Sequence, residues 1–209
     1  MKKLLLVSLF LALFVGLTSC DGKKKELTAE KQTADSALVV ENIVNLDKQY
    51  MFNNYAKDWR WYETCIVLKD FLDSENCDGT VSGVSNIFQA IVNREEGIDT
   101  KVVMITHVGD STQIDEVHSF WVEDFPMNDD AIKLTFKEAF DKVMATNSPK
   151  PHSRQVVLRK EVGPNQINPQ YIFGNTKAQL YVDAVTGTVT DKNPAFPAGK
   201  LNKPLGEWP

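Results

Sequence analysis

The histidines are the first residues whose types could do chemistry, because two of them fall on neighbouring predicted strands. A turn centred near Asp110 and Ser111 would place His107 opposite Ile114 rather than opposite His118. No cysteine or carboxylate at ligand spacing adds a further donor to either ring. We therefore expect no metal site.

The acidic side chains that could serve as acids or bases are spread along the chain. Glu63, Asp70, Glu123 and Asp124 have no spacing that would bring them together, and the sequence holds no nucleophile motif and no phosphate-binding loop. The sequence therefore predicts a protein without catalytic residues or a cofactor.

Two cysteines in the interior of the sequence could form a disulfide in an oxidising compartment. Cys77 lies at the tip of a predicted hairpin, and Cys65 lies 12 residues before it on the first strand. Twelve extended residues span roughly 40 Å, whereas a disulfide needs Cα atoms about 4.4–6.8 Å apart. We expect both thiols to be free, and a bridge would require a different hairpin register.

Aromatic side chains give the candidate ligand contacts. Trp59, Trp61 and Trp121 could stack on a sugar or another flat ligand. Isolated aromatics of this kind more often pack in a core, and the sequence allows both roles.

The N-terminus has the pattern of an export signal. Lys2 and Lys3 precede an apolar run from Leu4 to Leu17 that is too short to span a membrane comfortably. The run ends in Leu-Thr-Ser-Cys at positions 17–20, which resembles the lipobox of bacterial lipoproteins. This resemblance implies that residues 1–19 are removed and that Cys20 is lipidated; the alternative is a free or disulfide-bonded Cys20.

The charge balance argues against nucleic acid as a partner. Removal of residues 1–19 would take away two of the 23 basic residues and none of the 28 acidic ones, changing the net charge from −5 to about −7.

Residues 20–33 are polar and have no hydrophobic period, so they are expected to form a flexible tether between lipid and domain.

Residues 34–126 are predicted to form a helix followed by an antiparallel sheet. A helix is expected from Ser36 to about Tyr55, and strands are expected over 59–72, 80–92, 101–108 and 114–125. Strict alternation in the first strand would put Trp59, Trp61, Cys65, Val67 and Phe71 on one face and Tyr62, Ile66, Leu68 and Leu72 on the other.

Residues 127–192 are predicted to form a second unit of the same kind. Thr135 and Glu138 form a capping box that begins a helix. Strands follow over 155–162, 170–173 and 178–183, and a turn at Thr186-Gly187 leads into a short strand through Val189. Residues 193–209 form a proline-rich tail.

The second unit is similar to a PepSY-type domain. The resemblance covers about Ile132 to Asp191 and rests on the capped helix, the strand with Tyr171-Ile172-Phe173, and Val182-Asp183-Ala184 followed by Thr-Gly-Thr-Val at 186–189. It implies a helix packed on an antiparallel sheet, a non-catalytic role, and occurrence in exported or membrane-anchored proteins. Related domains occur in metallopeptidase propeptides, where inhibition has been proposed.

The first half could be a diverged copy of this unit. Gly-Thr-Val-Ser at 79–82 is similar to Gly-Thr-Val-Thr at 187–190. A tandem arrangement resembles PepSY-like lipoproteins with a fold of the β-lactamase-inhibitor-protein type, which suggests architecture and does not by itself assign a function.

The sequence thus predicts an α+β protein in which helices pack on one face of an antiparallel sheet, in two helix-and-strand repeats. We expect a non-catalytic protein that is lipid-anchored in the bacterial cell envelope, at the outer membrane, and that binds a protein partner, with inhibition or regulation of a peptidase as a narrower form. The alternative is a lipoprotein that binds an envelope carbohydrate or a small molecule.

Overall fold

The computed structural model describes residues 38–55, 58–93 and 99–196. The predicted signal segment, Cys20, the tether, Ser36 and the tail beyond residue 196 lie outside the described residues. None of the described helices is long and apolar enough to cross a membrane.

The described chain is an α+β fold dominated by an antiparallel sheet of nine strands, which confirms the predicted class. Its strand order is β4-β3-β2-β1-β6-β7-β8-β9, and β5 pairs with β6. The elements are α1 (Val40–Tyr55), β1 (Trp59–Leu68), β2 (Val81–Asn93), β3 (Asp99–Val108), β4 (Ser111–His118), β5 (Asp124–Phe125), the 3-10 helix η1 (Asp129–Ala131), α2 (Phe136–Met144), β6 (Gln155–Glu161), β7 (Gln170–Asn175), β8 (Ala178–Asp183) and β9 (Val189–Thr190).

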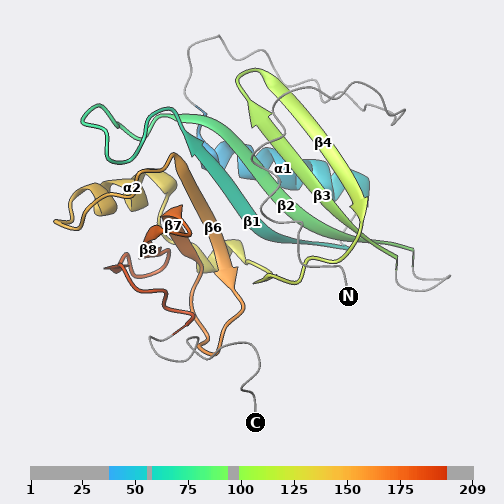
Figure 1. The fold of residues 1–209 in the computed structure, drawn as a ribbon. Helices are drawn as coiled ribbons and strands as arrows, with labels where there is room; N and C mark the ends of the chain where they lie inside the picture. Colours follow the sequence, from blue (N-terminus) through green and yellow to red (C-terminus); the bar gives the residue numbers. More distant parts are fainter. Residues whose placement is uncertain (1–37, 56–57, 94–98, 197–209) are drawn as a thin grey trace.

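Pairing of β1 with β6 makes the sheet continuous. Five residue pairs join the two strands, from Glu63 opposite Arg159 to Val67 opposite Gln155. β1 therefore lies between β2 and β6, as expected for a strand that is apolar on both faces. The chain thus runs twice through a helix followed by four antiparallel strands, first as α1 with β1–β4 and then as α2 with β6–β9 (Figure 1).

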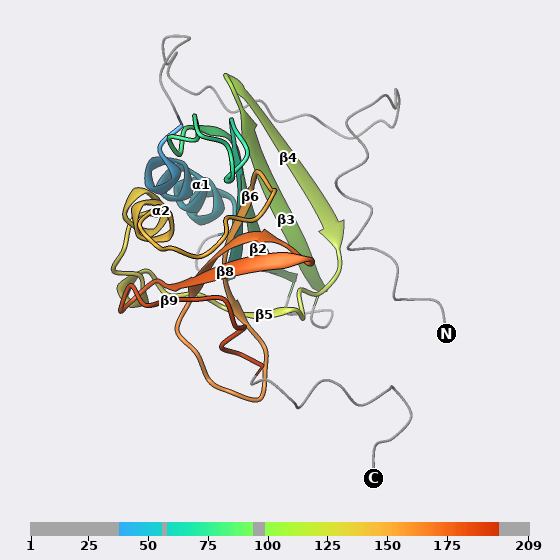
Figure 2. The same ribbon diagram turned by 60° about the vertical axis from the view of Figure 1, so that its left-hand side comes forward.

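The two helices lie side by side on the same side of the sheet (Figure 2) and cover part of it. The backbone N–H of Phe136 at the start of α2 donates to Glu41 in the first turn of α1, at 2.6 Å. Carboxylates are favoured at helix N-termini because the first N–H groups have no partner within the helix. One hydrophobic cluster contains buried residues of both helices and of the sheet, so the two halves share a core.

The capped second helix is confirmed. The Thr135 hydroxyl accepts from the backbone N–H of Glu138, and the Glu138 carboxylate accepts from the backbone N–H of Thr135. The predicted apolar face of Phe136, Ala139, Phe140 and Val143 is buried. The sequence alone predicts this helix and its buried face because capping and the 3.6-residue period are local properties.

A β-bulge in β1 corrects the predicted faces of that strand. Trp61 pairs with Phe88 and Glu63 pairs with Ile87, so Tyr62 is an extra residue in the ladder. Each extra residue shifts the alternation by one. Trp59 and Trp61 therefore share a face with Thr64, Ile66 and Leu68, whereas Cys65 and Val67 point to the opposite side.

The fourth strand is shorter than expected, and its register differs. It ends at His118 instead of continuing to Phe125, and the chain then leaves the sheet before β5. His107 lies opposite Thr112, not Ile114, because the turn is the two-residue connection Gly109-Asp110. His118 lies opposite Lys101, so the two histidines do not meet.

The turn after β8 is fastened by Asp183. One oxygen of its carboxylate accepts from the backbone N–H groups of Val185 and Thr186, both at 2.9 Å. Gly187 has φ +73°, a conformation that favours glycine. Burial opposes ionisation of Asp183, but these two hydrogen bonds, together with side-chain hydrogen bonds that include one from Asn168, outweigh burial and lower its pKa. Asp183 is therefore a turn residue.

Candidate functional site

The side of the sheet that points away from α1 has an uncharged centre. Residues opposite one another in antiparallel strands point to the same side, and Asn86 and His107 point toward Asp47 on α1. The alternate residues of β2 and β3 therefore point away from the helix. We call these eight residues the open face: Gly83, Ser85, Ile87, Gln89, Val102, Met104, Thr106 and Val108. Val108 is exposed, Gly83 and Ile87 are buried, and the other five are half-buried.

The open face combines apolar side chains with neutral hydrogen-bonding groups. The hydroxyls of Ser85 and Thr106 are 2.9 Å apart across the two strands. Val108 is 44% exposed, and Val67 on β1, on the other side of Gly83, is 37% exposed. Depletion of charge at the centre of a surface is typical of protein–protein interfaces.

Charged residues gather beside the open face, where β1 meets β6. We call Glu63, Asp124, Arg159 and Glu161 the carboxylate cluster. The Arg159 guanidinium contacts Glu161, and it lies 3.7 Å from both Glu63 Oε2 and Asp124 Oδ1. Three largely buried carboxylates therefore face one guanidinium.

The segment between β4 and β5 brings Asp124 to this cluster. The backbone N–H of Trp121 donates to Gln89 Oε1 at 2.8 Å, and its indole N–H donates to Asp124 Oδ2 at 3.0 Å. Asp124 then pairs with Glu161 on β6. Next along the chain, the backbone N–H of Met127 donates to Trp61 O on β1, so the segment spans from β2 to β6.

Ionisation of Asp124 is unfavourable in this position. Burial raises its pKa to about 7, and the negative charge of Glu63 adds to the rise, while Arg159 and the Trp121 hydrogen bond oppose it. Asp124 Oδ1 and Arg159 Nε are buried without a hydrogen-bond partner among the described residues. The cluster is therefore able to hold a proton near neutral pH.

Cys65 adjoins the cluster but is a poor nucleophile. Its thiol donates to Glu63 Oε1 at 2.9 Å, and burial together with the Glu63 charge raises its pKa well above the usual range. The thiolate is the reactive form of cysteine. Cys65 and Cys77 are both free, as expected for residues at the middle and the tip of one hairpin.

The three predicted contact tryptophans do not share a surface. Trp61 is only 4% exposed, and the Lys48 ammonium lies 3.8 Å from its ring centroid. Trp59, on the same face, packs edge-on against Phe88 at 5.6 Å between ring centroids. Trp121 lies on the other side of the sheet, against Gln89. They therefore cannot form a single stacking platform.

The expectation that the acids stay apart is wrong for one pair. Glu63 and Asp124 both contact Arg159, whereas Asp70 lies at the β1–β2 connection beside Cys77. The only feature of the sequence that favours this convergence is Arg159, whose positive charge attracts carboxylates. The residues meet through the β1–β6 and β5–β6 pairings, which no local pattern encodes.

A second polar group, missed by the sequence reasoning, lies beneath α1. His107 Nε2 is 2.7 Å from Asp47 Oδ1, and His107 Nδ1 is 3.0 Å from the Thr112 hydroxyl. Asn86 donates to the other Asp47 oxygen at 2.7 Å and accepts from Thr64. The order Thr-His-Asp is that of a hydrolytic triad, but Asp47 is fully buried under the helix. Its contacts fasten α1 to the sheet.

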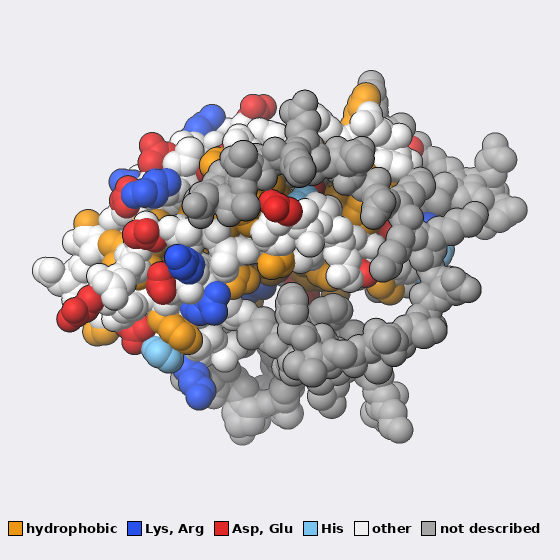
Figure 3. Space-filling model, turned by 90° about the horizontal axis from the view of Figure 1, so that it is seen from above, with side chains coloured by type: hydrophobic (Ala, Val, Ile, Leu, Met, Phe, Trp, Pro, Cys, Tyr) orange, Lys and Arg blue, Asp and Glu red, His pale blue; other side chains and the backbone are white. Residues whose placement is uncertain are grey.

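Among the described residues, no group of His, Cys, Asp and Glu side chains is arranged to hold a metal ion. Seen from above, acidic and basic side chains are interspersed with hydrophobic ones on the described part of the molecule (Figure 3). On the described residues in that view, Lys and Arg side chains do not gather into a large patch of the kind that nucleic-acid binding needs.

Comparison with known proteins found no matching family model, no matching curated protein and no matching solved structure.

The raised pKa of Asp124 predicts a specific pH dependence of stability. An unfolded aspartate has a pKa near 3.9, so between about pH 4 and pH 7 the folded chain binds more protons than the unfolded chain. Stability should fall as the pH rises through this window. Asp124→Asn should flatten the dependence and be more stable than wild type at pH 8, by on the order of 1–3 kcal/mol.

Urea unfolding at a series of pH values measures this effect. Glu123→Gln, which removes an exposed neighbouring charge, is the matched control and should follow the wild-type curve. A variant Asp124→Asn that is less stable than wild type at pH 8 would show that ionised Asp124 stabilises the fold through Arg159, contrary to this account.

Proposed function

We propose that the chain is a non-catalytic, lipid-anchored protein of the bacterial cell envelope that binds a protein partner. The observation that carries the proposal is the uncharged open face. It offers Val102, Met104 and Val108 beside the hydroxyls of Ser85 and Thr106, on two paired strands. Such a surface loses little on desolvation and suits contact with another protein more than contact with a charged ligand.

The anchor is proposed from the N-terminal sequence. The basic start, the apolar run and Cys20 after Leu-Thr-Ser support export and lipidation, followed by a polar tether. Several acyl chains on one cysteine hold a protein firmly at a membrane. We place the protein at the outer membrane.

A tandem PepSY-like architecture is the proposed origin of the fold. It is supported by the two successive runs of one helix and four antiparallel strands, and by the Asp183 turn at the end of the second run. The narrower form of the function is inhibition or regulation of a peptidase. The open face, which has no charged side chain, would then cover part of that enzyme.

The carbohydrate-binding alternative based on the tryptophans has less support. It needs Trp59, Trp61 and Trp121 on one accessible surface, and the fold separates them. We therefore favour a protein partner for the sheet.

Lipidation predicts a simple change on substitution. Cys20→Ser should abolish incorporation of labelled palmitate and shift the protein from the detergent phase to the aqueous phase on phase partition, because the serine hydroxyl cannot take the thioether-linked lipid. Cys77→Ser, which removes a thiol from the folded part, is the control and should stay lipidated. Continued palmitate labelling of Cys20→Ser would exclude the proposed anchor site.

The open face predicts which substitution disrupts partner binding. Met104→Arg places a charge on this face, opposite Asp115 of β4, and should reduce recovery of the partner from solubilised envelope by at least about tenfold, because the guanidinium must lose its water when a partner covers it. Affinity purification with quantitative mass spectrometry measures the recovery.

Ala145→Arg is the matched control, because it adds the same charge at an exposed position at the end of α2. Its partner recovery should equal that of wild type. The proposed role of the open face would be contradicted if Met104→Arg recovered as much partner as wild type does. It would also be contradicted if wild type recovered no protein reproducibly.

A further inference from the structure

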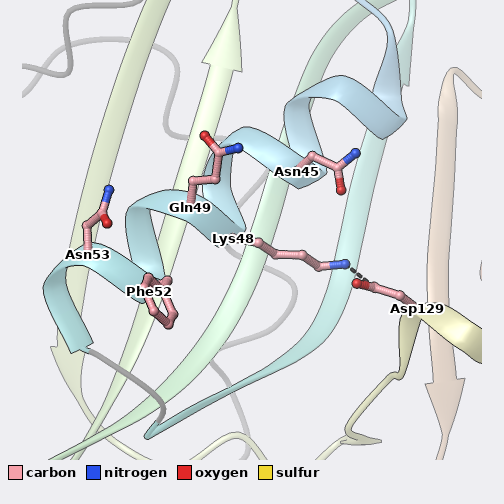
Figure 4. A pocket seen from close by; sticks show the side chains of 6 residues that line it. All are labelled: Asn45, Lys48, Gln49, Phe52, Asn53 and Asp129. Carbon is pink, nitrogen blue, oxygen red and sulfur yellow. Dashed lines mark hydrogen bonds and ion pairs between the residues drawn. The ribbon is translucent and has the colours of Figure 1, made fainter.

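The outer side of α1, on the helix side of the molecule, borders an open hollow of about 660 Å³. Figure 4 shows the lining side chains, which come from α1 and from η1. They are Asn45, Lys48, Gln49, Phe52, Asn53 and Asp129. This hollow is separate from the open face, because α1 lies on the opposite side of the sheet from that face.

Three side-chain amides follow one another along this helix. Asn45, Gln49 and Asn53 are spaced four residues apart, so each lies about 6 Å further along the helix axis than the last. All three are exposed, and Figure 4 shows them projecting from the outer side of α1. Within the described part of the chain they have no hydrogen-bond partner. Each amide carries both donors and an acceptor.

The charges in the hollow neutralise each other. The Lys48 ammonium pairs with Asp129 and lies over the Trp61 ring, so it faces inward from the row of amides. Its side chain is 14% exposed, and burial lowers its pKa. The chain as a whole is acidic, with 28 acidic and 23 basic residues. An uncompensated charge that would select an ionic ligand is absent from these six lining residues.

Phe52 supplies an apolar surface next to the amides. Its side chain is 57% exposed, although burial of a phenylalanine contributes roughly 1.5–3 kcal/mol to folding. A ligand suited to this site is uncharged, offers many hydroxyl donors and acceptors, and has apolar ring faces. A peptide ligand would need pockets for its own side chains. The hollow has no such pockets among its six lining residues, whose one apolar group is the Phe52 ring.

We infer that the outer side of α1 is a binding site for a neutral oligosaccharide. The amides of Asn45, Gln49 and Asn53 bond sugar hydroxyls, and the Phe52 ring stacks on a sugar face. The site does not depend on the protein partner proposed for the open face, because it lies on the other side of the sheet.

Calorimetric titration tests this inference. The full chain in phosphatidylcholine nanodiscs is titrated with cellohexaose, maltohexaose and hexa-N-acetylchitohexaose, and with a neutral glycine–serine peptide. At least one of these saccharides should bind with a Kd of about 10 μM to 1 mM. Phe52→Ala and Gln49→Ala should each weaken this binding by roughly fivefold or more, which is the loss of one stacking or hydrogen-bonding contact.

Asn147→Ala, which removes an exposed amide after α2, is the matched control and should bind as wild type does. The substituted side chains are exposed, and unchanged thermal midpoints confirm that each variant is folded. Absence of binding for all three saccharides, binding that both variants leave unchanged, or tighter binding of the peptide would each overturn the inference.

Discussion

The antiparallel pairing of β1 with β6 is the constraint on which the rest of this structure depends. Five residue pairs between these strands turn two four-stranded runs into one sheet. Without them, each run would be a separate four-stranded sheet with one helix, and β1 and β6 would be edge strands with unpaired backbone groups. The pairing also places α1 and α2 on the same side and lets them share one core.

Because this pairing puts both helices on one side of the sheet, the two sides carry different groups. On the helix side, Asp47 and His107 are buried and fully paired beneath α1. On the other side, the open face is uncharged, and the carboxylate cluster lies at the β1–β6 junction. A half-buried guanidinium is stabilised by carboxylate partners, and Arg159 lies directly opposite Glu63 in the ladder. Asp124 adds a third carboxyl group, and burial raises the pKa of this group to about 7.

Local features of this fold could be predicted from the sequence, and long-range ones could not. The capping box of Thr135, the hairpin tip at Cys77 and the Asp183 turn depend on neighbouring residues, so the sequence predicts them. Conversely, the bulge at Tyr62 reverses the side-chain pattern of β1 without any glycine or proline to mark it. The carboxylate cluster needs residues from β1, β5 and β6, so its convergence requires knowledge of strand pairing. The row of amides at 45, 49 and 53 is visible in the sequence. Uncharged polar residues on a helix do not indicate a binding site, however, until the hollow beside them is known.

The central claim, that the open face binds a protein partner, is tested most directly by site-specific photo-cross-linking in the native cell envelope. A photoreactive phenylalanine analogue replaces Met104 on the open face or, in a second strain, Lys137 on the exposed side of α2. If the open face binds a partner, light should produce a discrete cross-linked protein from position 104 and not from position 137. Cross-links of equal yield at both positions, or a discrete product from position 137 alone, would contradict it.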